Sequence, residues 1–313
     1  MQNESLPTSV PNPRLPNDSC TPMDSQPPIY AFSRYGLANR LLGLASTMYI
    51  CRTLRRPLVL IWEQNSNIGN TKFSDLFDNV ITTVSQKPSA IPIVLGDRPQ
   101  TEDSFPANMP IILECHDICQ FPGLNDLAIS TGLQSLLLAP AILSTLTAFT
   151  KSHDIANFLG IHVRKGDKWH SIKSSSLRSR VESQYDIAIR EIVQSTGANL
   201  YLACDDPKTW KKYKRMYGKR IFCAPKSRNP LRRDKIAIAE ALLDLYLLSK
   251  TKFILYGIGT FGYAAHLLGG NLARNILCSK KEFFFFFHTI QGLPLNSFPD
   301  VNEIVNEIAE CIL

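Results

Sequence analysis

The sequence lacks several features that mark whole classes of protein. In 313 residues, no apolar run reaches the about 18 residues that a membrane-spanning helix needs. Residues 1–28 contain no basic segment followed by an apolar stretch, so we expect no secretory signal. The chain has no Walker A pattern and no Asp-x-Asp motif, and the turn at Gly36 does not match the Gly-x-Gly-x-x-Gly fingerprint. It has no convincing Ser-His-Asp or Cys-His arrangement. These absences predict a cytoplasmic protein with no transmembrane segment that is neither a P-loop enzyme nor a triad hydrolase.

The composition is that of a globular protein. Hydrophobic residues make up 44% of the chain and charged residues 19%. Seven of the 20 prolines fall in residues 1–28, with Ser and Asn between them. Such a segment buries too little apolar area to offset the cost of ordering, and we expect a disordered tail there. The remaining length suggests two domains.

The eight cysteines are scattered along the chain. Without a secretory signal, free thiols in a reducing compartment are favoured over disulfides. The stretch from Cys115 to Cys119 contains His116 and Asp117, which suggests a metal site. No second Cys or His pair with zinc spacing follows it, so we expect no metal there.

Positive charge is concentrated in residues 205–235. The whole chain has a formal net charge of +7, while this segment holds twelve Lys or Arg and three Asp, a net +9. The rest of the chain is therefore close to −2. This local patch fits either a phosphate-bearing small ligand or a polyanion.

Apolar runs typical of strands alternate with stretches of helical periodicity. This alternation predicts an α/β protein with parallel sheets covered by helices. Two such series predict two Rossmann-like lobes that face each other across a cleft, with domains at 29–150 and 151–313. The expected strands are 29–32, 57–62, 91–95, 110–114, 158–163, 199–204, 220–223, 252–256 and 273–278. The expected helices are 40–54, 73–77, 125–150, 178–195, 207–217, 233–249, 261–268 and 300–312.

A basic segment follows the expected strand at 158–163, at the sheet edge where open α/β sheets bind ligands. Alternation places His162 and Arg164 on one face of this strand. An arginine fork suits a phosphate because it makes two parallel charge-assisted bonds. The alternative is a strand end with a solvated basic turn.

Carboxylates occur at two further positions. Asp206 before Pro207 is well explained as a helix N-cap, and Asp205 can face the cleft. The pair could also hold Mg²⁺, although adjacent side chains point in different directions. Asp244 lies in an apolar helix, where a carboxylate needs a partner. That partner is either the N–H donors of a guanine base or a local arginine, Arg232 or Arg233.

Two turns join a strand to a helix and contain small residues. Gly259, Thr260 and Phe261 begin one helix, where backbone N–H groups can approach an anion. The other turn contains Gly36 and Asn39. Asn39 either caps the next helix or faces the cleft from the first lobe.

Taken in order, these segments resemble the fucosyltransferase superfamily, which includes α1,6-, nodulation and protein O-fucosyltransferases. The resemblance covers about residues 30–280 and is loose between 80 and 150. The matching segments are Gly36-x-x-Asn39-Arg40, Pro57-Leu-Val-Leu-Ile-Trp62, Phe73-Ser-Asp-Leu-Phe77, His162-Val-Arg164-Lys-Gly-Asp167-Lys168, Leu202-Ala-Cys-Asp-Asp-Pro207, Asp244-Leu-Tyr-Leu-Leu-Ser249 and Gly259-Thr-Phe261.

The resemblance implies a GT-B-like fold, a GDP-sugar in the cleft and no metal or other cofactor. It implies that Arg164 binds the β-phosphate and steadies the leaving GDP. The other residues that it places around the donor are Asn39, His162, Lys168, Asp205, Asp244, Gly259, Thr260 and Phe261. Negative charge builds on the β-phosphate during sugar transfer, so fixed cations and amides there stabilise the transition state.

The sequence departs from the family in two places. Ser171 and Ile172 stand where α1,6-fucosyltransferases have a Glu, so the resemblance assigns no catalytic base to this chain. His170 is a substitute candidate because imidazole titrates near neutral pH. In the third motif, Gly259 replaces one of two serines.

The predicted function is therefore metal-independent, inverting transfer of fucose from GDP-fucose to a glycan acceptor. A transferase using another GDP-sugar is a close alternative, and a catalytically inactive glycan-binding protein is another. A polyanion-binding protein using residues 205–235 is a third, although that patch lacks an RNA-binding motif, and we expect no nucleic-acid partner.

Overall fold

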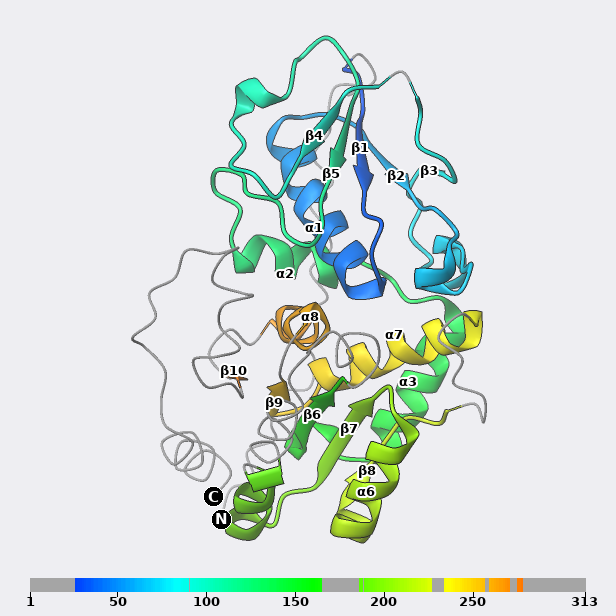
Figure 1. Ribbon diagram of the computed structural model, residues 1–313, viewed down its shortest axis with the longest axis vertical. Helices are drawn as coiled ribbons and strands as arrows, with labels where there is room; N and C mark the ends of the chain where they lie inside the picture. Colours follow the sequence, from blue (N-terminus) through cyan, green and yellow to red (C-terminus); the bar gives the residue numbers. More distant parts are fainter. Residues whose placement is uncertain are drawn as a thin grey trace, which may run out of the picture.

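The computed structural model describes residues 26–89, 91–164, 186–187, 189–226, 234–256, 259–270 and 275–277. It is a mixed α/β structure with two five-stranded sheets (Figure 1). Every pair of neighbouring strands in both sheets is parallel. The expected tail at 1–28 lies almost wholly outside the described residues.

The first sheet has the strand order β3-β2-β1-β5-β4. Phe32, the last residue of β1, is in register with Ile61 of β2 on one side and Glu114 of β5 on the other. The chain leaves β1 toward one edge and returns on the other side of it. The ends of β1 and β5 thus form the point where parallel sheets commonly bind ligands. The strands are β1 (Ile29–Phe32), β2 (Leu58–Ile61), β3 (Thr83–Val84), β4 (Ile93–Leu95) and β5 (Ile111–Glu114).

The second sheet has the strand order β10-β9-β6-β7-β8. Its central strand β6 is buried along its whole length, as expected for a parallel strand covered on both faces. The strands are β6 (Leu159–Val163), β7 (Leu200–Cys204), β8 (Ile221–Phe222), β9 (Phe253–Tyr256) and β10 (Asn275–Leu277).

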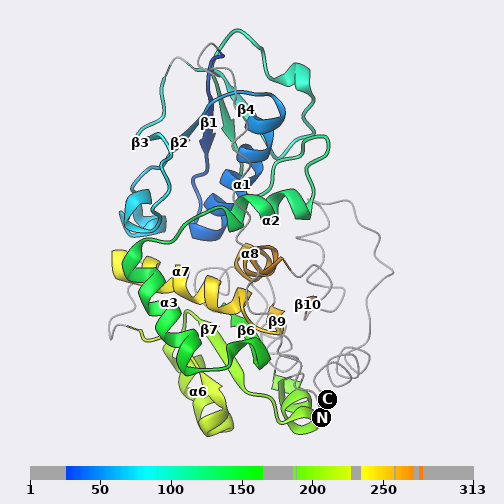
Figure 2. The same ribbon diagram turned by 180° about the vertical axis from the view of Figure 1, so that it is seen from behind.

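Helices lie between the two sheets and join them. Helix α8 packs against α1 and α2 of the first part and against α7 and β9 of the second. Figures 1 and 2 show it between the sheets from opposite sides. One hydrophobic cluster continues through these helices, from Leu41 in α1 to Leu242 in α7. The helices are α1 (Leu37–Thr53), α2 (Asp126–Gln134), α3 (Pro140–Ser152), α6 (Pro207–Tyr217), α7 (Lys235–Ser249) and α8 (Thr260–Gly269).

Most of the expected elements are confirmed, with three corrections. The helix expected at 125–150 is two helices, because Pro140 cannot continue a helix and instead begins α3 at its first position. The helix expected at 73–77 is one 3₁₀ turn, Phe73–Asp75. The two-residue strand β3 was not expected. The helix expected at 300–312 lies outside the described residues, and that at 178–195 lies partly outside.

No helix in the described part of the chain is long and apolar enough to cross a membrane.

Candidate functional site

The candidate site lies where the carboxyl ends of the two sheets face each other. The first turn of α1, after β1, contributes Asn39. The end of β6 contributes His162, and Arg164 follows it. The first turn of α8, after β9, contributes Thr260 and Phe261. Asp205 directly follows β7 and is exposed. The structure thus brings Asn39, His162, Thr260 and Phe261, which come from three separate segments, to one region.

Asn39 connects the two parts of the molecule. Its side-chain oxygen accepts a hydrogen bond from the Thr260 hydroxyl at 2.9 Å, and its Nδ2 donates to the His116 carbonyl at 2.7 Å. Helix α1 begins at Leu37 with Gly36 as its N-cap, so Asn39 lies inside the first turn. The interpretation of Asn39 as a helix cap is therefore wrong. Its side chain instead contacts Thr260 at the start of α8, and the interpretation in which it faces a cleft stays a prediction.

The His162 side chain packs against the first turn of α8. Its ring stacks on Phe261, with ring centroids 4.8 Å apart and planes 24° apart. The side chain is only 7% exposed. Burial, with the positive charges of Arg164 and Lys226, lowers the pKa of His162 to about 3. The imidazole is therefore neutral at physiological pH, and Phe261 covers one of its faces.

The first turn of α8 offers backbone amides to an anion. Its N-cap is Gly259, whose φ of 117° is a conformation that other residues rarely adopt, and no side chain caps the helix. Gly262 lies one turn in, and a Cβ there would lie 2.3 Å from Cβ of Tyr256 in β9. Glycines thus allow both the sharp entry and the close packing that position Thr260. Unsatisfied N–H groups at a helix N-terminus favour negative charge.

Asp244 is held inside the protein by two partners. It is 4% exposed, and it accepts hydrogen bonds from the Tyr201 hydroxyl at 2.6 Å and the Lys226 ammonium at 2.7 Å. Burial raises the pKa of Asp244, and both contacts act in the opposite direction. Burial alone would lower the pKa of Lys226, but Asp244 and nearby thiols raise it overall. At these distances we assign a carboxylate–ammonium pair.

The expected local partner of Asp244 was Arg232 or Arg233, and both lie outside the described residues. Lys226 and Tyr201 were not predicted, because Lys226 lies 18 residues before Asp244 and Tyr201 lies 43 residues before it. Only the buried carboxylate itself gave a signal that some partner was required. Lys226 also donates to the Cys204 carbonyl at 2.9 Å, which ties the pair to the end of β7.

Asp206 caps α6 as predicted. Its carboxylate accepts from the backbone N–H of Thr209 at 2.8 Å and of Lys208 at 3.3 Å, and Pro207 is the first helical residue. Because these oxygens serve the helix, they are poorly placed to hold Mg²⁺ together with Asp205. Among the described residues, no group of three or more His, Cys, Asp or Glu is placed to hold a metal ion.

Two predicted residues cannot be placed. Lys168 and the candidate base His170 fall within 165–185, outside the described residues.

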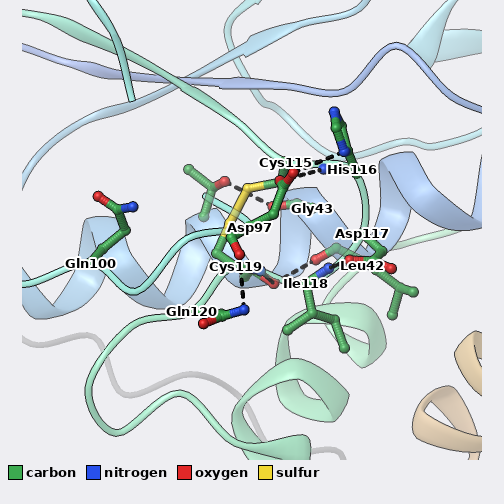
Figure 3. Close-up of a disulfide and its surroundings, with 12 residues drawn as sticks. Leu42, Gly43, Asp97, Gln100, Cys115, His116, Asp117, Ile118, Cys119 and Gln120 are labelled. Carbon is green, nitrogen blue, oxygen red and sulfur yellow. Dashed lines mark hydrogen bonds and ion pairs between the residues drawn. A yellow bond between two sulfur atoms is a disulfide. The ribbon is translucent and has the colours of Figure 1, made fainter. Parts of the chain in front are cut away.

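The prediction of free thiols is wrong for one pair. Cys115 and Cys119 form a disulfide directly after β5 (Figure 3). Gly96 packs against it, and a Cβ there would lie 2.5 Å from the Cys115 sulfur. The bond closes a short loop that holds His116. Both sulfurs are used, so this stretch does not form the metal site that its spacing suggested. Cys51, Cys204 and Cys223 are free thiols.

A second charged cluster at the end of β5 was also not predicted. Glu114 is buried, and its two carboxylate oxygens form ion pairs with Arg34 and Lys87, each at 2.9 Å. Both cations also lie over the ring of Phe32. These residues come from three separate segments, and nothing in their spacing links them.

No protein-family model and no curated protein matches the sequence. Solved structures do match the fold. The fucosyltransferase NodZ from Bradyrhizobium gives a TM-score of 0.53 at 18% identity, over 77% of this chain and 92% of that one. A NodZ α1,6-fucosyltransferase crystal soaked with GDP-fucose gives a TM-score of 0.55 at 18% identity, over 77% of this chain and 91% of that one.

Two other fucosyltransferases match with similar scores. Arabidopsis thaliana FUT1, in complex with GDP, gives a TM-score of 0.54 at 14% identity, over 80% of this chain and 70% of that one. POFUT1 in complex with GDP gives a TM-score of 0.52 at 11% identity, over 83% of this chain and 100% of that one. At these identities the match concerns the fold. The resemblance suggested by the sequence motifs is thereby confirmed at that level: the chain has the fold of these fucosyltransferases.

Proposed function

We propose that the protein transfers fucose from GDP-fucose to a hydroxyl of a glycan acceptor, by an inverting mechanism that needs no metal. The observation that carries this proposal is the meeting of Asn39, Thr260, Phe261 and His162 between the two sheets. It is supported by the shared fold of fucosyltransferases solved with GDP or GDP-fucose.

We assign the donor to the cleft of a GT-B-like pair of lobes, 29–150 and 151–313. The neutral ring of His162 would contact the guanine or ribose, and the α8 amides would hold the pyrophosphate. Arg164 would neutralise the β-phosphate, and Lys168 would add charge nearby. Asp205 would contact the donor from the end of β7. Asp244 would act indirectly, because its buried ion pair holds Lys226 in position.

The reaction breaks the bond between fucose C1 and the β-phosphate oxygen, and GDP leaves with the electron pair. The acceptor oxygen attacks C1 from the opposite face, which inverts the anomeric centre. The acceptor proton must pass to a base, for which the sequence offers His170. Fixed positive charge at Arg164 and the α8 amides stabilises the departing GDP. The N-terminal lobe would bind the glycan.

Incubation with GDP-fucose in the presence of EDTA tests this proposal. We expect GDP release at a rate that chelation leaves unchanged, accelerated by oligosaccharide acceptors. We expect the Arg164→Ala variant to lose at least 100-fold in kcat, the size typical of removing one transition-state charge contact. GDP-mannose is the matched control for the donor. If GDP-mannose is consumed faster than GDP-fucose, the assignment of the sugar is wrong.

The cytoplasmic location predicted from the sequence stays a prediction. The Cys115–Cys119 disulfide counts against it, because such bonds persist mainly in oxidising compartments.

A further inference from the structure

His116 and Asp97 form a hydrogen-bonded pair beside the candidate site. The imidazole Nδ1 lies 2.8 Å from one carboxylate oxygen of Asp97, and the backbone N–H of His116 donates to the other at 3.2 Å. Figure 3 shows the second ring nitrogen on the far side of the imidazole from Asp97. A carboxylate that holds Nδ1 leaves Nε2 to accept a proton, which is the arrangement of a general base.

The side chain of Asn39 connects His116 to the proposed phosphate site. The His116 carbonyl accepts the hydrogen bond from Asn39, and Asn39 accepts one from Thr260 at the start of α8. The His116 side chain is 48% exposed, and the edge of Tyr35 packs against its ring at 4.8 Å between centroids. The imidazole is therefore fixed in orientation and still accessible to an acceptor.

The neighbouring charges favour His116 over Glu114 as the base. Glu114 lies two residues earlier on the same strand end, but Arg34 and Lys87 use both of its oxygens. The carboxylate of Asp97 contacts the imidazole directly, at Nδ1. The disulfide between Cys115 and Cys119 closes the loop that presents His116, which limits its movement.

We propose that His116, oriented by Asp97, is the general base that takes the proton from the acceptor hydroxyl. This inference rests on the proposed function and adds a catalytic residue from the N-terminal lobe. As the acceptor oxygen forms its bond to fucose C1, its proton passes to Nε2 of His116. The C1–phosphate bond breaks, and GDP leaves with the electron pair. His116 thus replaces His170 as the candidate base.

The test measures GDP release from GDP-fucose, with water or an oligosaccharide as acceptor, and GDP affinity by calorimetry. We expect His116→Gln to lower kcat by at least 100-fold while the Kd for GDP stays within twofold. We expect Asp97→Asn to lower kcat by about tenfold. Added imidazole should restore part of the activity of His116→Ala.

Matched controls are His153→Gln, which replaces a histidine packed on Phe149, and Asp103→Asn, which replaces an exposed aspartate of the same lobe. Both should keep the wild-type kcat. The inference is overturned if His116→Gln keeps full activity. A wild-type protein that neither binds GDP nor consumes GDP-fucose refutes the proposed function, and the inference with it. If the His116→Gln variant binds GDP but is inactive, the donor site is intact and the loss concerns the base. This result distinguishes a failure of the inference from a failure of the proposed function.

Discussion

Lowering the pH from 7 to 4 is expected to destabilise the protein through His162 by about 3 kcal/mol. Burial lowers the pKa of this imidazole to about 3 in the folded protein, against an ordinary value of 6.5. Between these two values the unfolded chain binds a proton that the folded protein does not. The stabilising contribution is therefore complete above pH 6.5 and is lost as the pH falls from 6.5 toward 3.

The measurement is the free energy of unfolding in urea at pH 7 and pH 4 for the wild type and His162→Gln. Other groups titrate in both proteins, so the difference between the two isolates His162. We expect this difference to shift by about 3 kcal/mol in favour of the variant at pH 4. A difference that is the same at both pH values would show that His162 is not buried as a neutral group, and would remove the neutral ring that the proposal places against the donor.

Replacing Lys226 by Met is expected to destabilise the protein by about 3 kcal/mol. The change leaves the Asp244 carboxylate, which is 4% exposed, with Tyr201 as its remaining partner in the described structure. Removing one member of a buried pair typically costs about 3–5 kcal/mol, because the other charge stays buried. We place the effect at the lower end because the Lys226 side chain is 30% exposed.

Urea unfolding at pH 7 measures this effect. Lys219→Met, at an exposed site, is the matched control and should change the free energy of unfolding by less than about 0.5 kcal/mol. The double variant Lys226→Met/Asp244→Leu removes both charges and should recover much of the loss. If the single variant is as stable as the control, the ion pair does not hold the end of β7 in place.

The sequence predicted most of the sheet framework, because parallel strands buried on both faces appear as short continuous apolar runs. The run from Leu159 to Val163 is such a strand, and it correctly placed His162 and Arg164 at a sheet edge. The break between α2 and α3 was missed, although Pro140 cannot occupy a helix interior and begins α3 at its first position. The two-residue strand β3 has too few residues to give a periodicity.

The contacts of the site were less predictable, because they join residues far apart in the chain. Asn39 and Thr260 are separated by 221 positions, and only the packing of α8 against α1 brings them together. The dyad of His116 and Asp97 was missed because the stretch from Cys115 to Cys119 was weighed only as a metal site. The Cys-x-x-x-Cys spacing was itself compatible with a disulfide, but the lack of a secretory signal favoured free thiols.

Thermal unfolding with added nucleotide tests most directly whether the space between the two sheets binds a GDP-sugar. GDP, UDP and ADP are compared without metal on the wild type and Arg164→Ala. A ligand at 100 times its Kd stabilises by about 2.7 kcal/mol, which corresponds to a rise in Tm of about 5 °C for a protein of this size. We predict that GDP alone raises the Tm of the wild type and that Arg164→Ala loses the rise. An equal response to all three nucleotides, or none to GDP, would contradict the account.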